Sequence, residues 1–102
     1  MGKLVRDRVP DLIRESGRSP RVARLSAAAY RRALIDKLRE EVDELAAAHT
    51  TESLLDEAAD VLEVLAAIAV EHGAALATIV DIARVKRLEL GRLRSAAMAR
   101  RC

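Results

Sequence analysis

The sequence predicts an all-α protein: a small antiparallel helical bundle with one short N-terminal helix and three longer ones. The composition is 51% hydrophobic, yet Tyr30 is the only aromatic residue, which suits packed helices better than a strand-rich sandwich. Apolar residues recur at helical spacing, and short connections favour antiparallel neighbours. A length of 102 residues predicts one domain over residues 1–102.

The N-terminal helix is expected over residues 10–16. Pro10 suits the first position of a helix and biases Val9 toward an extended conformation. Gly17 suits the end of this helix. The stretch GRSPRVARL (17–25) contains Gly, Ser and Pro and therefore predicts a connecting loop.

Good capping residues separate the three longer helices. Ser26 is expected to cap the first of them, and Thr50 or Thr51 the second. Glycines follow the second and third helices, where chains often turn. The predicted ranges are 26–48, 50–73 and 75–90, followed by a basic tail over 94–102 that either continues as helix or frays.

Charge and apolar runs limit the classes of partner. Positive charge gathers in residues 3–32 and 84–101 around an acidic centre. This asymmetry indicates an anion site near the centre, a weak nucleic-acid surface or an ordinary solvated surface. No run approaches the roughly twenty apolar residues of a membrane span, no signal-peptide pattern is present, and Cys102 has no partner for a disulfide. We therefore expect a cytoplasmic protein without a membrane partner.

The stretch KLREEVDEL (37–45) places acidic side chains beside the expected apolar stripe. Successive residues of a helix turn by about 100°. Glu41 then falls at the border of the stripe and Glu44 just beyond it, whereas Glu40 and Asp43 point toward solvent. Two of the four acids are thus candidates for a site.

The next predicted helix repeats this pattern. Glu57 falls within the wider apolar arc, Asp60 flanks it, and Glu63 lies on the opposite face. In an antiparallel hairpin the two acidic pairs can converge, and four unpaired carboxylates would repel unless a divalent cation such as Mg²⁺ joined them. The competing interpretation is a solvated face neutralised by nearby cations: Arg31, Arg32 and Arg39.

Several motifs occur in the order found in one known enzyme family: KLVRDRVPDLI (3–13), EEVDE (40–44), EAAD (57–60), ADVLEV (59–64) and VKRLELG (85–91). The acidic motifs resemble the EExxE…ExxD signature of the MazG-like all-α nucleoside triphosphate pyrophosphohydrolases. The opening resembles the KLVRDKIPxxI start of a compact house-cleaning subgroup. The last motif departs from the subgroup, because ELGRL (89–93) stands where something like ERGGF is usual.

The resemblance implies an enzyme that cleaves a nucleoside triphosphate between its α- and β-phosphates, giving the monophosphate and pyrophosphate. The cofactor would be Mg²⁺, with Mn²⁺ as a substitute. Glu41, Glu44, Glu57 and Asp60 would hold the metal, and Glu41 or Glu44 would accept the proton of the attacking water. The substrate's phosphates would meet basic side chains from both ends of the chain: Lys3, Arg6, Arg8, Lys86 and Arg87. For the three N-terminal residues, the alternative is an ion-pair cluster that pins the segment to the bundle.

Two other functions remain open. A phosphoribosyl-ATP pyrophosphatase of histidine biosynthesis uses similar acids, although the KLVRD-type start favours the house-cleaning subgroup. A catalytically lapsed helical module could instead dimerise or bind nucleic acid through its basic tail, which the four acids argue against. No pattern for reading a base is visible; Tyr30 either stacks on a base or packs as a half-buried residue. Because the Ala-rich helices should leave apolar surface exposed, a homodimer or higher homo-oligomer is expected.

Overall fold

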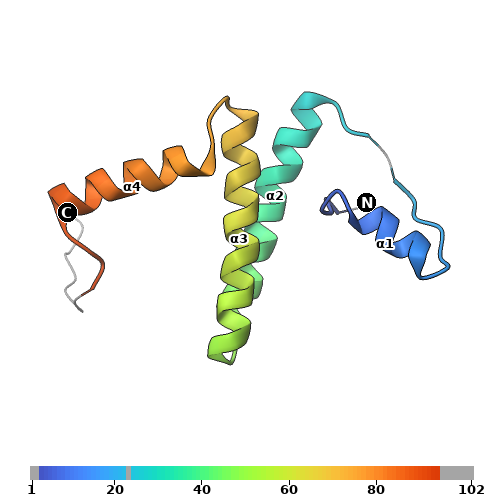
Figure 1. The fold of residues 1–102 in the computed structure, drawn as a ribbon, viewed down its shortest axis with the longest axis horizontal. Helices are drawn as coiled ribbons and strands as arrows, with labels where there is room; N and C mark the ends of the chain where they lie inside the picture. The colour runs from blue at the N-terminus through green and yellow to red at the C-terminus, as the bar shows by residue number, and fades with distance from the viewer. Residues whose placement is uncertain (1–2, 23, 95–102) are drawn as a thin grey trace.

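A computed structural model describes residues 3–22 and 24–94 of the chain (Figure 1). The described residues form four helices and no strand: α1 (Val9–Glu15), α2 (Ala27–Ala46), α3 (Thr51–Glu71) and α4 (Leu76–Leu90). The all-α prediction is therefore confirmed. Apart from residue 94, the predicted basic tail lies outside the described residues, and so does Cys102.

The two long central helices begin at the caps that the sequence predicts. The Ser26 hydroxyl accepts a hydrogen bond of 3.2 Å from the backbone N–H of Ala29. The Thr50 hydroxyl accepts one of 3.0 Å from the N–H of Ser53. Each bond satisfies an N–H group that has no partner within its helix, which fixes where the helix starts.

Some helix boundaries differ by one or two residues from the prediction. α1 begins at Val9, so Pro10 lies inside its first turn, where the missing N–H costs nothing. α2 ends at Ala46, two residues early. After α3, Gly73 has φ +78°, a value that residues with side chains rarely adopt. It lies in the turn where the chain bends by 105° into α4.

α2 and α3 pack side by side as an antiparallel hairpin at the centre of the molecule (Figure 1). The best-buried apolar residues are Leu34 on α2 and Val64 and Ala69 on α3. Other large apolar residues of α2, among them Ile35 and Val42, remain exposed. One hairpin therefore encloses only a small core.

α4 extends away from the hairpin and meets α3 only near its own beginning (Figure 1). Leu76 is half-buried, but every later residue of α4 is exposed, including Leu88 at 83% and Leu90 at 81%. Within the described residues, no single helix is both long and apolar enough to cross a membrane; α3 and α4 meet that criterion only when joined across their bend. The hairpin thus supplies the packed part of the fold.

Candidate functional site

Acidic side chains from α2 and α3 gather on one side of the hairpin. One carboxylate oxygen from each of Glu41, Glu44 and Glu57 lies within 4.8 Å of the others. Asp56, Glu57 and Asp60 form a second group by the same measure. Because Glu57 belongs to both groups, the five side chains form one continuous acid cluster.

Two oxygens of this cluster are buried and have no hydrogen-bond partner within the part of the chain that the structure describes. Glu41 is only 5% exposed, and its Oε2 has no hydrogen-bond partner among the described residues. The Oε2 of Glu57 is also buried and has no hydrogen-bond partner among these residues. Leaving a buried polar group unpaired costs about 1–3 kcal/mol, and more for a charged group. Oxygen donors arranged in this way fit a hard divalent cation such as Mg²⁺.

The charges within the cluster act on one another. The negative charge of Glu41, and then that of Glu57, raises the pKa of Glu44. Lys37 Nζ lies 3.1 Å from Glu41 Oε1 and 3.7 Å from Glu40 Oε1. Burial alone would lower the pKa of Lys37, but its hydrogen bond to Glu41 and the nearby glutamates raise it above the ordinary value. Lys37 therefore stays charged and offsets part of the cluster's charge.

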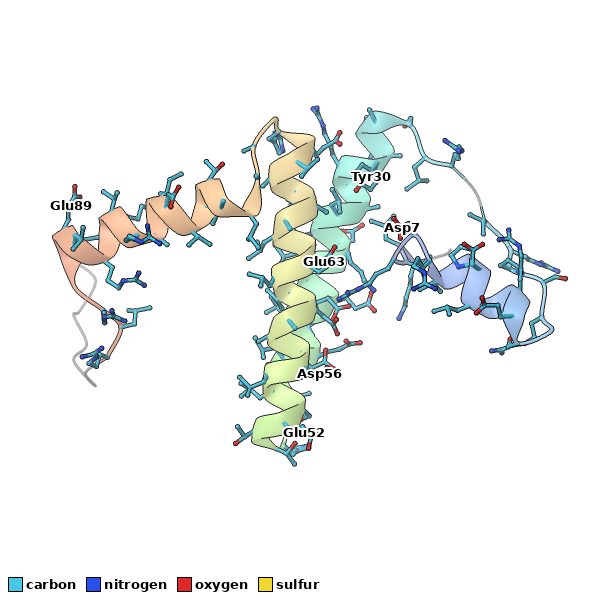
Figure 2. All side chains as sticks on the ribbon, in the orientation of Figure 1. Asp7, Tyr30, Glu52, Asp56, Glu63 and Glu89 are labelled. Carbon is cyan, nitrogen blue, oxygen red and sulfur yellow. The ribbon has the colours of Figure 1, made fainter. Side chains whose placement is uncertain are left out.

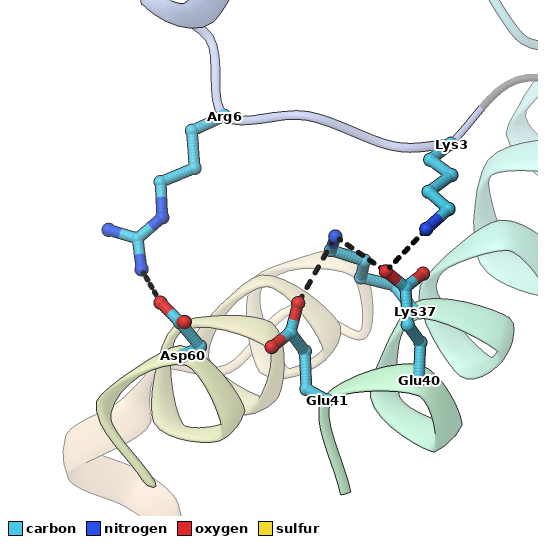
Figure 3. A network of polar contacts seen from close by, with 6 residues as sticks. All are labelled: Lys3, Arg6, Lys37, Glu40, Glu41 and Asp60. Atoms are coloured by element: carbon cyan, nitrogen blue, oxygen red, sulfur yellow. Dashed lines mark hydrogen bonds and ion pairs between the residues drawn. The ribbon is translucent and has the colours of Figure 1, made fainter. Parts of the chain in front are cut away.

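The segment before α1 supplies further cations (Figure 3). Arg6 Nη2 lies 2.8 Å from Asp60 Oδ1, and Lys3 Nζ lies 3.1 Å from Glu40 Oε1. The hydrogen bond from Lys3 holds the pKa of Glu40 below its ordinary value. These contacts match the ion-pair alternative for the N-terminal segment, and they place Arg6 directly beside the acid cluster.

A cleft of about 550 Å³ separates residues 4–8 from the hairpin. Figure 2 labels Asp7, Tyr30 and Glu63, which all line it. Glu63 is exposed, as expected for the helix face opposite the apolar stripe. It nevertheless lines the cleft, because the N-terminal segment adds a second surface beside α3. The full lining is Leu4, Val5, Arg6, Asp7, Arg8, Tyr30, Leu34, Lys37, Glu41, Asp60, Glu63, Val64 and Ala67.

The structure brings together most of the residues predicted for the site, but not all. Glu41, Glu44 and Glu57 converge, Asp60 joins them through Glu57, and the N-terminal cations lie close by, with Arg8 in the cleft wall. Lys86 and Arg87 instead lie on α4, which extends away from the hairpin (Figure 1).

The sequence reasoning missed two members of the site, Asp56 and Lys37. Lys37 precedes Glu41 by four residues, a spacing that places two side chains together on one helix face. Asp56 precedes Asp60 by the same spacing and adjoins Glu57. Both could have been found by extending the acidic pairs one turn along their helices.

Sequence comparison relates the chain to known proteins. Residues 9–87 match the family model described as phosphoribosyl-ATP pyrophosphohydrolase. A Mycolicibacterium smegmatis protein described only as uncharacterized is 54% identical over 56 residues, which cover 55% of this chain and 57% of that protein. The chain therefore aligns with little more than half the length of this relative. No solved structure matches the chain. The chain belongs to the phosphoribosyl-ATP pyrophosphohydrolase family, in the MazG-like all-α superfamily.

Proposed function

We propose that the protein is a Mg²⁺-dependent nucleoside triphosphate pyrophosphohydrolase that releases a nucleoside monophosphate and pyrophosphate. Its family implies pyrophosphohydrolase activity in general. The observation that carries the finer proposal is the pair of buried, unpartnered oxygens on Glu41 and Glu57 inside the acid cluster. We place the activity in the cytoplasm, where such nucleotides are made and used.

Glu41, Glu44 and Glu57 would hold the cation, with Asp60 and Asp56 completing its surroundings. Mn²⁺ would substitute, because it accepts the same oxygen ligands. When bound, the metal supplies positive charge to the phosphate oxygens and makes water a stronger nucleophile.

Glu44 is the best-placed residue to accept the proton of the attacking water. It is exposed to solvent, whereas Glu41 is buried and paired with Lys37. A base for this step must reach the water as well as the cluster, and only an exposed member of the group does so.

The cations of the N-terminal segment would bind the substrate's phosphates. Arg6 and Arg8 line the cleft next to the acid cluster, and Lys37 lies in the same wall. Arg6 now pairs with Asp60. If Asp60 held the metal instead, the guanidinium of Arg6 would be available to bind phosphate oxygens in the two-point manner that suits arginine.

Two alternatives are less well supported. The family description names phosphoribosyl-ATP, which is also a nucleoside triphosphate, but the KLVRD-type segment lining the cleft is the mark of the house-cleaning subgroup. A non-catalytic module would have no need for an acid cluster with two unpartnered buried oxygens.

We further propose that the working unit is a homodimer. Large exposed apolar side chains that gather on one element mark a candidate interface. Between the charged residues of α4, five exposed apolar residues point in all directions at 100° per residue. These residues are Ile79, Val80, Ile82, Val85 and Leu88.

A second copy of the chain is the partner that fits α4. The hairpin itself leaves large apolar residues exposed, including Leu54, Leu55 and Leu62 on α3. Residues 40–83 contain no Lys or Arg, whereas the end of α4 carries Lys86 and Arg87. A partner's α4 packed on α3 would therefore complement that helix in both apolarity and charge, and would bring these two cations toward the acid cluster.

The direct test is a pyrophosphate-release screen over a panel of nucleoside triphosphates and phosphoribosyl-ATP, with and without Mg²⁺. The screen is repeated on Glu57→Gln and on Glu52→Gln, an exposed acid of the same helix outside the cluster. We expect Mg²⁺-dependent release that Glu57→Gln abolishes and Glu52→Gln retains. If no nucleotide releases pyrophosphate, the proposed function is wrong.

A further inference from the structure

The cleft beside the acid cluster is elongated and has two distinct ends. Along α2, Tyr30, Leu34, Lys37 and Glu41 line it on successive turns. The first and the last lie eleven positions apart, which corresponds to about 16.5 Å of helix at 1.5 Å per residue. α3 runs antiparallel, so Asp60 lies at the end with Glu41.

These two ends differ in chemistry. The end near Asp60 holds two ion pairs, Arg6 with that carboxylate and Lys37 with Glu41. At the other end, one half-buried aromatic ring and aliphatic side chains line the cleft: Tyr30, Leu34, Val64 and Ala67. The charged side chains of Asp7, Arg8 and Glu63 line the cleft as well.

A ligand that matches both ends is anionic at one end and flat and weakly polar at the other. A nucleoside triphosphate has this character, since its phosphates suit the cations and acid-bound metal while its base suits an aromatic face. The volume of about 550 Å³ lies within the range of roughly 300–1,000 Å³ typical of small-molecule sites.

We propose that this cleft is the nucleoside pocket and that the ring of Tyr30 contacts the substrate's base. The proposal rests on the proposed nucleotide function and adds where the base lies. It also gives the N-terminal segment a second task, because residues 4–8 form the wall that faces the hairpin across the pocket. Tyr30 would serve as a general contact for the base, since every base offers a flat face to an aromatic ring.

The composition of the chain makes this proposal unusually direct to test. Tyr30 is its only tyrosine, and there is no Trp or Phe. Protein labelled with ¹³C in tyrosine therefore gives one set of ring resonances from the pocket itself. The probes are α,β-methylene nucleoside triphosphates with Mg²⁺, which are not cleaved between the α- and β-phosphates, and inorganic tripolyphosphate, which has no base.

We expect the nucleotide analogues to shift the Tyr30 ring resonances and to give nuclear Overhauser effects between the ring and base protons. Tripolyphosphate should compete with the analogues for binding, and phosphorus NMR measures this competition. It should not give base contacts, because it has no base. Tyr30→Ala should weaken binding of the analogue by roughly tenfold or more, while tripolyphosphate binding stays unchanged. Tyr30→Leu, which keeps much of the packing volume, is the second variant if Tyr30→Ala does not fold.

The outcomes separate this proposal from the proposed function. Bound analogue without any change at Tyr30, or base protons that contact other residues only, would place the nucleoside elsewhere and overturn the pocket. Pyrophosphate release would then still stand as the function. Contacts between Tyr30 and the base in a protein that releases no pyrophosphate would support the pocket and overturn the enzyme.

Discussion

Arg6 and Asp60 lie 54 positions apart in the chain, yet Arg6 Nη2 is 2.8 Å from Asp60 Oδ1 (Figure 3). Both side chains are well exposed, at 59% and 39%. An exposed ion pair typically contributes about 0–1 kcal/mol to stability. The pair is therefore weak enough to be exchanged for a phosphate or a metal ion.

Replacing Arg6 should affect substrate binding more than folding. We expect Arg6→Ala to lower the free energy of unfolding by less than about 1 kcal/mol, because its pair is exposed. The KM for the nucleotide should rise about tenfold, as expected for the loss of one charged phosphate contact. Denaturant unfolding and steady-state kinetics measure the two effects.

Arg14→Ala is the matched control for Arg6→Ala. Arg14 makes an ion pair of the same 2.8 Å length with Asp11, is similarly exposed, and lies on α1 away from the cleft lining. It should reproduce the small stability effect with an unchanged KM. A KM for Arg6→Ala equal to that of the control would remove Arg6 from the phosphate site.

Glu44 should destabilise the metal-free protein at neutral pH. Its pKa is raised in the folded state by Glu41 first and then by Glu57, so folding favours its protonated form. The stability that this provides is complete below the unfolded pKa, and it is lost as the pH rises through the folded pKa. We expect Glu44→Gln to raise the melting temperature of metal-free protein at pH 7, with no gain at strongly acidic pH.

Glu40 should behave in the opposite way. Its hydrogen bond from Lys3 lowers its folded pKa, so its contribution to stability is present above the unfolded pKa and is lost as the pH falls. Glu40→Gln should therefore lower the melting temperature at neutral pH and have little effect below the folded pKa. Melting temperatures of both variants are measured over a pH series. Changes in melting temperature of the same sign at neutral pH would contradict the assigned charge environments.

Mg²⁺ should stabilise the protein through the acid cluster even without substrate. A ligand at one hundred times its dissociation constant stabilises the folded state by about 2.7 kcal/mol. We expect a rise in melting temperature that depends on Mg²⁺ concentration, is smaller in Glu57→Gln and is unchanged in Glu52→Gln. Equal shifts in all three proteins would indicate binding elsewhere.

The substitution Leu88→Arg should show whether the protein is a homodimer or a monomer. Leu88 is 83% exposed, so in a monomer this change is expected to alter stability by no more than about 0.5 kcal/mol. In a dimer that buries α4, it would place a charge in an apolar interface. We expect sedimentation to show a wild-type dimer at micromolar concentration and a dissociated or unstable variant; a monomeric wild type would rule out the assembly.

Local chemistry made much of the fold predictable. Ser26 and Thr50 mark helix starts because each cap bonds to a backbone N–H only three residues away. The convergence of Glu41, Glu44 and Glu57 also followed from the helical repeat and a short connection.

Contacts across the chain were much harder to foresee. The position of Glu63 at the cleft depends on where residues 3–8 cross α3, which no periodic pattern encodes. Likewise, the 105° bend before α4 depends on the backbone angles of the few residues around Gly73. A helical repeat in the sequence does not specify these angles. Lys86 therefore lies on a helix that extends away from the acid cluster (Figure 1), whereas the resemblance assigns it to the substrate's phosphates.

The isolation of α4 also has a consequence for how the protein can be observed. Its 15 residues are near the lower limit of roughly 12–15 at which a helix is marginal in water without support. A lone chain should consequently lose helix upon dilution, and two chains should regain it together. The circular dichroism of the sample would then report the fraction of associated chains, and the abundance of the protein in a cell would set the proportion of its copies that are fully folded.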